Sequence, residues 1–380
     1  MEITKLIADF NQLYFDLQSH PYLIDFPEKA EEFHNLYFQL LGSISDYSSF
    51  LDSLTALTCF FHDGHTNIEL PYRSTDLCIP IRCSWHHERL IVAEDYGAIP
   101  QGAELTEIEG IPMFMVVKRL LHRIPHENIF LVKSRLTEYP YRNYHLFSDL
   151  NLAAVFGEKK EYSLSYQHDG QSNQISLPLV PYDGFLDFSD DNFLSWYIAD
   201  GHAHLKLNTC ICDDSYVNAL QDLAQACSEN NATTLTLDLS HNMGGTSEVI
   251  EKFLEYVDID SFYRYEMIDY ATGKPACICS RSETVTNKKQ KFLFPKNIIC
   301  KIGNTTFSSA RTFAVTLYDN HIATLEGEPT GGKPSSYGMP RKCTLQNSGI
   351  RFRVSHAWFG RPNPGLDSDV TLAPKSCFLL

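Results

Sequence analysis

Two adjacent serines occupy the point of the chain where covalent chemistry is most readily expected. Ser308 and Ser309 follow a strand-like run, Ile298 to Ile302, and an apolar stripe at helical spacing begins at Phe313. The first N–H groups of a helix lack partners within it and, together with the helix dipole, favour negative charge. A serine at the start of this helix could therefore act as a nucleophile whose reaction develops an oxyanion.

A pair of glycines lies at an earlier turn from strand to helix. Gly244 and Gly245 come after the strand-like run Thr234 to Leu239 and before a helical stripe that begins at Val249. Because glycine adopts backbone conformations closed to other residues, the pair could bring N–H groups close to a bound atom. Taken alone, it is typical of an ordinary tight turn. With a serine at the next such turn, it favours an oxyanion-binding loop.

The alternation of strands and helices after about residue 196 predicts how these two turns come together. Strand-like runs at 203–208, 234–239 and 298–302 alternate with helical stripes, and a further strand near Ile322 leads to a Gly-rich turn that ends in Lys333. This order predicts a mainly parallel sheet with helices on its faces, which binds ligands at the C-terminal ends of its strands. Both turns leave the sheet at those ends.

The rest of the chain predicts two more regions, so that the whole is a multi-domain α/β protein. Apolar stripes indicate a helical segment over residues 1–75, and its third helix runs into the sequence His62-Asp63-Gly64-His65-Thr66. Short alternating runs indicate a β-rich module over residues 76–190. Residues 191–380 would then form the α/β core.

Composition and charge exclude several classes of function. The chain has 380 residues, of which 43% are hydrophobic and 21% charged, as in a soluble globular protein of two or three domains. A net charge of −16 makes nucleic acid and anionic membranes poor partners. No apolar run reaches the roughly 20 residues that span a bilayer. Because the start lacks a signal-peptide pattern, the sequence as written predicts a cytoplasmic protein, or an extracytoplasmic one if a leader has been removed.

The eleven cysteines, which extend to Cys377, do not indicate a metal site. The pairs Cys210/Cys212 and Cys277/Cys279 lie in strand-like runs, and no second pair or histidines match them at zinc-ligand spacing. We expect buried, reduced thiols, with no metal and no cofactor.

Four segments, in this order along the chain, resemble blocks of one serine-peptidase family, that of the C-terminal processing (tail-specific) peptidases and the tricorn core protease. The block that closes the family's N-terminal helical region resembles HDGHTNI, and the segment of its PDZ-like module resembles ELTEIEGIP. The family's DLR-N-x-GG segment is similar to TLTLDLSHNMGG. The block in which the nucleophilic serine begins a helix, followed by GE-x-T-x-GK, is similar to TFSSARTFA…TLEGEPTGGK. The resemblance implies a crotonase-like α/β core and a reduced PDZ-like module.

The resemblance also implies roles for individual residues. Ser308 would be the nucleophile, with Ser309 as its backup. Otherwise the backbone N–H of Ser309 would form an oxyanion hole together with that of Gly244 or Gly245. Each such donor typically contributes about 10²–10³ in rate.

Two residues are candidates for the general base, because the family uses two solutions. Tail-specific members use a lysine at the position of Lys333, which would have to be desolvated to be neutral at working pH. Tricorn-like members use a histidine that matches His65, which needs no large pKa shift. On that ground we favour His65. Asp367 is a candidate for the supporting acid.

Two positions depart from the family pattern. The arginine of DLR is Ser240 here, and the acidic residue expected after SSA is Arg311. Arg311 could stabilise an oxyanion or a substrate carboxylate, or it could mark a member that has lost activity.

The sequence therefore predicts a serine peptidase that hydrolyses short or unfolded polypeptides through an acyl-enzyme on Ser308. It leaves open whether identical chains associate. The alternative is a non-catalytic protein on the same fold, which binds an apolar ligand or serves as a scaffold.

Overall fold

The computed structural model describes residues 1–184 and 192–375 and is a mixed α/β structure. Its helices, including the short 3₁₀ helices η1 and η2, are α1 (Ile3–Leu17), α2 (Pro21–Asp25), α3 (Lys29–Ser43), α4 (Tyr47–Cys59), α5 (Met113–Leu120), η1 (Leu121–Arg123), α6 (Ile129–Glu138), α7 (Asp149–Phe156), α8 (Asp214–Glu229), α9 (Glu248–Leu254), α10 (Ser308–Asp319) and η2 (Pro364–Leu366).

The strands of the first half of the chain are β1 (Asn67–Glu69), β2 (Leu77–Cys78), β3 (Cys83–His86), β4 (Arg89–Val92), β5 (Glu104–Ile108), β6 (Ile111–Pro112), β7 (Glu161–His168), β8 (Gln171–Pro178) and β9 (Val180–Pro181). Those of the second half are β10 (Leu194–Ala199), β11 (His202–Leu207), β12 (Thr234–Asp238), β13 (Ser261–Tyr263), β14 (Glu266–Asp269), β15 (Ala276–Cys279), β16 (Thr284–Thr286), β17 (Asn297–Ile302), β18 (Ala323–Gly327), β19 (Ser336–Thr344) and β20 (Arg351–Gly360).

The chain divides into two compact units, each described here by itself. The first consists of Met1–His126, Val132–Ser189 and Pro340–Ser355. The second consists of Glu127–Leu131, Asp190–Met339 and His356–Leu380. The predicted boundary at 190/191 falls within residues 185–191, outside the described part of the chain.

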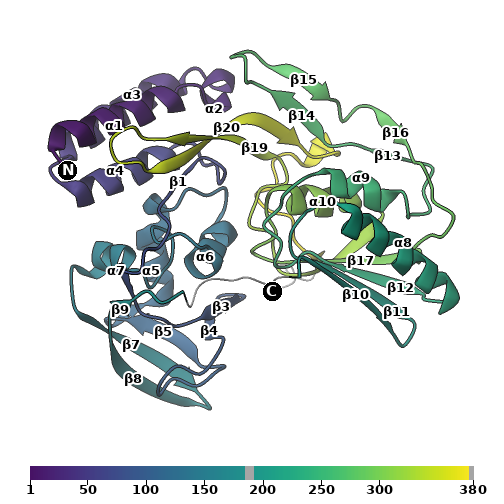
Figure 1. Cartoon of the computed structure of the whole chain (residues 1–380), viewed down its shortest axis with the longest axis horizontal. Helices are drawn as coiled ribbons and strands as arrows, with labels where there is room; N and C mark the ends of the chain where they lie inside the picture. Colours follow the sequence, from purple (N-terminus) through teal and green to yellow (C-terminus); the bar gives the residue numbers. More distant parts are fainter. Residues whose placement is uncertain (185–191, 376–380) are drawn as a thin grey trace. The chain divides into compact units, whose positions relative to one another are not determined.

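The first unit contains the N-terminal helices, which Figure 1 shows in purple beside β1 and the part of the β19–β20 hairpin that belongs to this unit, residues 340–355. The helix α4 begins with a capping box between Asp46 and Ser49, which satisfies N–H groups of its first turn. Residues 340–355, predicted to belong to the C-terminal core, instead belong to this unit. The physical reason is burial, because Phe352 and Val354 share a hydrophobic core with Phe10 of α1.

The same unit contains an antiparallel sheet with the strand order β3-β4-β5-β7-β8, with β6 paired to β5. Its core is separate from that of the helices and includes Leu105 and Leu164 from the strands and Val116 of α5. The sheet lies within residues 76–190, and the assignment of this region as a reduced PDZ-like module stays a prediction.

The second unit is built on a sheet with the order β10-β11-β12-β17-β18. The four strands β11, β12, β17 and β18 are parallel, and β10 pairs antiparallel to β11 as a hairpin. Figure 1 shows α8, α9 and α10 beside this sheet. Their apolar residues form one core with alternate residues of the strands, such as Leu205, Leu237 and Phe313. The alternation of strand and helix is thus confirmed, whereas the crotonase-like assignment stays a prediction.

The loops after β12 and β17 leave the sheet at the C-terminal ends of neighbouring parallel strands, since β12 pairs with β17. The first loop carries Gly244 and Gly245, and the second ends at Ser308. Almost the whole of α10 is buried, from Ser309 to Leu317, so packing on all sides fixes the position of its first turn.

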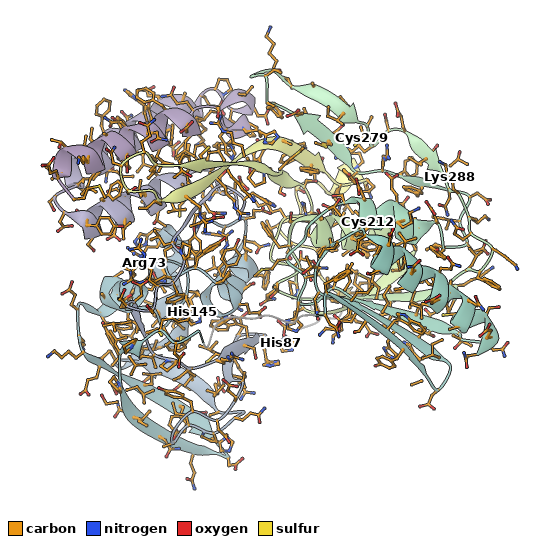
Figure 2. All side chains as sticks on the ribbon, viewed as in Figure 1. Arg73, His87, His145, Cys212, Cys279 and Lys288 are labelled. Carbon is orange, nitrogen blue, oxygen red and sulfur yellow. The ribbon has the colours of Figure 1, made fainter. Side chains whose placement is uncertain are left out.

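The described cysteines are free thiols, and Cys377 lies outside the described residues. The expectation of burial is right for Cys210 and wrong for Cys277, which is exposed on β15. Figure 2 labels Cys279 on the same strand. Among the described helices, none has both the length and the apolar character needed to cross a membrane.

Candidate active site

Ser308 is the first residue of α10 and adopts an unusual backbone conformation. Its φ of +53° lies in the left-handed region, directly after Phe307 with a φ of −138°. For a residue other than glycine, such a conformation costs on the order of 1–3 kcal/mol and persists only where the surroundings enforce it. Ser308 is partly exposed, and its hydroxyl makes no hydrogen bond with the described residues of its own unit. The sharp turn thus presents a hydroxyl that is available for reaction.

Gly244 lies directly against this turn. A Cβ built on Gly244 would stand 2.6 Å from the Cβ of Ser308 and 2.9 Å from the backbone nitrogen of Ser309, and the φ of Gly244 is +105°. The Phe307 N–H donates to the carbonyl of Asn242 at 3.1 Å, which ties the two loops together next to Ser308. Only glycine meets both the conformation and the distance at position 244.

Asn242 organises the glycine loop, a role that sequence reasoning did not assign. Its fully buried side chain donates to the carbonyl of Leu207 at 2.8 Å and accepts the N–H of Gly244 at 2.8 Å. The N–H of Gly244 is therefore already engaged. Of the two glycines predicted for the oxyanion hole, Gly245 is the one left to donate. The signal for Asn242 was present in the NMGG segment as the asparagine two residues before the glycines.

Gly245 is held by the main chain of Cys210. The Cys210 N–H donates to the carbonyl of Gly244, and the Thr246 N–H donates to the carbonyl of Cys210. Because a trans peptide is planar, the Gly245 N–H points opposite to the Gly244 carbonyl and hence away from Cys210. A Cβ on Gly245 would stand 2.1 Å from the Cys210 oxygen, so this position also requires glycine.

Ser309 is a partner of the glycine loop. Its buried hydroxyl donates to the carbonyl of Gly245 at 2.8 Å and lies 3.1 Å from the hydroxyl of Ser247. These bonds disfavour Ser309 as the nucleophile. Its backbone N–H belongs to the first turn of α10, where helical N–H groups lack helical partners.

The main chain of Lys333 is fixed on both sides, while its side chain is partly exposed. The Lys333 N–H donates to Glu127 Oε2 at 2.7 Å, and Arg311 Nη1 donates to the Lys333 carbonyl at 2.5 Å. In the described residues, Lys333 Nζ makes no hydrogen bond with Ser308. The geometry of the second unit therefore contains no preformed serine–lysine dyad.

Arg311 is 2% exposed, and Nη1 also donates to the carbonyl of Pro334 at 2.7 Å. Burial lowers the pKa of Arg311, and the charge of Glu127 partly opposes this effect. A guanidinium bound to the main chain in this way is not presented to a substrate, which argues against its interpretation as an oxyanion or carboxylate ligand. Ser240, the other departure, donates its hydroxyl to Asp238 at 2.6 Å within a local turn.

His65 lies in the first unit and is 9% exposed. Asp63, which sequence reasoning missed, accepts the His65 N–H at 2.8 Å, and its Oδ1 stands 3.6 Å from Nδ1 of the imidazole. The other carboxylate oxygen accepts from His20 Nε2 at 3.0 Å and from the Ser355 hydroxyl at 2.6 Å. Burial raises the pKa of Asp63, but the hydrogen bonds from His20 and His65 outweigh it and hold the pKa well below its usual range.

The tautomer of His20 follows from its other contact. The backbone N–H of Tyr22 donates to His20 Nδ1 at 3.0 Å, so this nitrogen carries the lone pair and the proton is on Nε2, facing Asp63. Asp63 is thus a fixed, ionised acceptor beside His65. The signal for it was the D-x-H spacing within HDGHT.

Asp367, the predicted acid, is engaged within the second unit. It forms an ion pair with Arg281 at 2.7 Å and accepts the Ser335 hydroxyl at 2.6 Å. Because Arg281 balances its charge, a structural role accounts for these contacts. A catalytic role for Asp367 stays a prediction.

Comparisons with known proteins agree with this geometry. Residues 203–364 match the model of Peptidase family S41. Mature CPAF complexed with lactacystin is 14% identical, with a TM-score of 0.72 over 98% of this chain and 93% of that one. Mature CPAF is 15% identical, with a TM-score of 0.71 over 98% and 92% of the two chains. A candidate peptidase from Parabacteroides merdae is 12% identical, with a TM-score of 0.51 over 97% and 87%. At these identities the structural matches establish likeness of fold. No curated protein matches the sequence.

Proposed function

We propose that the chain, whose residues 203–364 match the model of Peptidase family S41, is a serine peptidase that forms an acyl-enzyme on Ser308. The hydroxyl of Ser308 attacks the carbonyl carbon of a peptide bond. The resulting oxyanion accepts from the N–H groups of Gly245 and Ser309. Collapse of this intermediate breaks the C–N bond, the proton taken from the Ser308 hydroxyl passes through the base to the leaving amine, and an ester remains on Ser308, which water then hydrolyses.

The observation that carries this proposal is the left-handed conformation of Ser308 at the start of a buried helix, packed against Gly244. Strain of this kind needs a reason when a non-glycine residue bears it, and pre-organisation of a nucleophile is one. The hydroxyl of Ser309 is bound to Gly245, which leaves Ser308 as the serine that can react.

We propose His65 as the general base, on the sequence resemblance and on its environment in the first unit. Asp63 beside Nδ1 would orient the imidazole and stabilise its protonated form, as the acid of a serine–histidine–acid group does. Lys333 is the less suitable candidate, because a lysine base must lose solvent to become neutral and this side chain is partly exposed.

The substrate class proposed is short or unfolded polypeptides, cleaved without a metal or cofactor. The match of residues 203–364 to a peptidase family supports peptide substrates. As a reduced PDZ-like module, residues 76–190 would supply a second place where a peptide binds by strand addition.

The experiment that tests the proposal combines covalent labelling with substrate profiling. The protein would be treated with a fluorophosphonate and the adduct located by tandem mass spectrometry. A diverse peptide library would then be incubated with the wild type and with Ser308→Ala, and the products identified. We expect labelling on Ser308 and cleavage that the substitution abolishes.

The matched control is Ser172→Ala, since Ser172 is an exposed serine on β8 and should not affect either readout. A wild type that neither takes the label nor cleaves any peptide would overturn the proposal and favour the non-catalytic alternative. Labelling on Ser309 would keep the activity but reassign its nucleophile.

A further inference from the structure

The main chain around Lys333 is held between two side chains of opposite charge. Glu127 Oε2 accepts the Lys333 N–H, while Arg311 Nη1 donates to the carbonyls of Lys333 and Pro334. Hydrogen bonds in which one partner is ionised are about twice as strong as neutral ones. Two charged side chains therefore fix three main-chain groups, the N–H and the carbonyl of Lys333 and the carbonyl of Pro334.

Both charged side chains are buried, since Glu127 is 7% and Arg311 2% exposed. Burying a charge is costly unless the charge is hydrogen-bonded and balanced. The burial of Glu127 and Arg311 therefore indicates that their side chains have a specific structural role. The two charges also balance each other, since the charge of Glu127 favours the protonated form of Arg311.

The same segment packs against the turn that carries Ser308. A Cβ built on Gly332 would stand 3.1 Å from the ring of Phe307 and 3.2 Å from Glu127 Oε2, so Gly332 fills the space between them. Phe307 directly precedes Ser308, and Arg311 lies on the first turn of α10, three residues after it. The segment is thus held against the residues on both sides of Ser308.

The neighbouring contacts reinforce this arrangement. Asn128, one residue after Glu127, donates to the carbonyl of Thr330 at 3.1 Å. Asn304, in the loop before α10, donates to the carbonyl of Pro329 at 2.9 Å. A Cβ on Gly331 would stand 2.2 Å from the Asn304 oxygen. The segment 329–334 therefore has little freedom to move away from α10.

We propose that Arg311 and Glu127 are positioning residues, which lock the segment Gly332–Pro334 onto the first turn of α10 and so maintain the strained conformation of Ser308. Arg311 is then a component of the active-site framework, and its departure from the family pattern does not mark a loss of activity. The consequence for catalysis rests on the proposed peptidase function, whereas the structural part does not.

The structural part is tested by amide hydrogen exchange of residues 330–336, measured by mass spectrometry on the full chain. We expect Arg311→Met to raise the exchange rate of this segment by about tenfold or more, because two carbonyls lose a charged donor. Glu127→Leu should raise exchange at the Lys333 amide. Arg311→Lys should restore much of the protection, since an ammonium can also donate to both carbonyls.

The matched control is Arg264→Met. Arg264 pairs with Glu251 in the same unit and makes no hydrogen bond or ion pair with residues 330–336, all of which the structure describes, so exchange there should not change. Circular dichroism would verify folding, and Glu127→Leu and Arg311→Lys keep the test decisive should Arg311→Met fail to fold. Wild-type exchange rates at 330–336 in both Arg311→Met and Glu127→Leu would overturn the proposal.

The catalytic part is tested on the same proteins with a cleaved peptide. We expect kcat to fall by about tenfold or more in Arg311→Met with KM nearly unchanged, and Arg311→Lys to recover part of kcat. Loss of protection with an unchanged kcat would overturn the link to Ser308. A wild type that cleaves no peptide would refute the proposed function, while the exchange experiment would still decide the positioning role.

Discussion

The backbone of Gly244 and the side chain of Ser308 are in direct contact, although the two residues are 64 positions apart in the sequence. A Cβ on Gly244 would stand 2.6 Å from that of Ser308. The two loops that leave neighbouring parallel strands thus meet without intervening side chains. Any atom added at this contact must displace the proposed nucleophile or the helix start that carries the proposed oxyanion donor.

Gly244→Ala should therefore slow acylation of Ser308 strongly. The added methyl group would clash with Ser308 and Ser309, and alanine is strained at a φ of +105°. We expect the rate of fluorophosphonate labelling to fall by about 10²-fold or more, comparable to the loss of an oxyanion donor. Stopped-flow or time-resolved mass spectrometry of the adduct would measure it.

Gly42→Ala is the matched control. Gly42 lies in α3, and nothing stands within 4 Å of a Cβ at this position. Because alanine has the higher helix propensity, this substitution should stabilise the protein by up to about 1 kcal/mol and leave labelling unchanged. Labelling of Gly244→Ala at the wild-type rate would show that the contact does not position Ser308.

Ser309→Ala should lower kcat while leaving the nucleophile in place. The substitution removes the hydrogen bond from the Ser309 hydroxyl to the Gly245 carbonyl, so the Gly245 peptide loses its fixed orientation. We expect kcat to fall by about 10-fold to 10²-fold, less than for a deleted donor, with little change in KM. The adduct should still map to Ser308.

Ser247→Ala provides the comparison, because the Ser247 hydroxyl lies 3.1 Å from that of Ser309 and reaches the Gly245 carbonyl only through it. Its effect should be clearly smaller. A complete loss of labelling in Ser309→Ala, with its fold intact, would instead indicate that Ser309 is the nucleophile.

The turn before Ser308 and the order of strands and helices could be predicted from the sequence because both depend on local periodicity and on glycine and serine at strand ends. The functions of Asn242 and Arg311 could not be predicted in this way. Asn242 binds a carbonyl 35 residues earlier, and Arg311 binds carbonyls more than 20 residues later. Only the folded chain brings such partners together.

The contacts of the carboxylates Asp63 and Asp367 could not be predicted from the sequence for the same reason. Asp63 lies two residues before His65 in the sequence, yet its fixed position depends on His20 and on Ser355, which is 292 residues away. Asp367 was predicted from an acid near the C-terminus, and its local sequence gave no sign of its ion pair with Arg281, 86 residues earlier. Partner choice among charged residues is a property of tertiary structure.

The two candidates for the base can be distinguished by substitution. His65→Ala should lower kcat/KM by about 10²-fold to 10⁴-fold, the usual contribution of a general base. Lys333→Met should change it only a few-fold, because the contacts of Lys333 with Glu127 and Arg311 involve the main chain and persist. Initial rates on a peptide identified by the library experiment would measure both.

Glu328→Gln is the control for Lys333→Met, because it also removes one charge from a partly exposed side chain of the same loop. A large loss in Lys333→Met together with a small one in His65→Ala would reverse the assignment and support a serine–lysine dyad.

His145 should make the first unit sensitive to acid. It is a buried residue between α6 and α7, labelled in Figure 2, and burial lowers its pKa from 6.5 to about 3. Between these values the unfolded chain binds a proton that the folded chain excludes, so the free energy of unfolding falls as pH falls below 6.5. The expected slope is about 1.4 kcal/mol per pH unit. His145→Gln should remove this contribution.

The measurement is urea unfolding at pH 7.5 and pH 5.5, followed by the fluorescence of Trp85, which lies in the core of the β-rich region of the first unit. Replacing Trp196 and Trp358 by phenylalanine would leave Trp85 as the only tryptophan. The wild type should lose about 1 to 1.5 kcal/mol more than His145→Gln between the two pH values. His86→Gln, at an exposed histidine, should behave as the wild type. Equal losses in the wild type and in His145→Gln would mean that His145 is protonated in the folded protein.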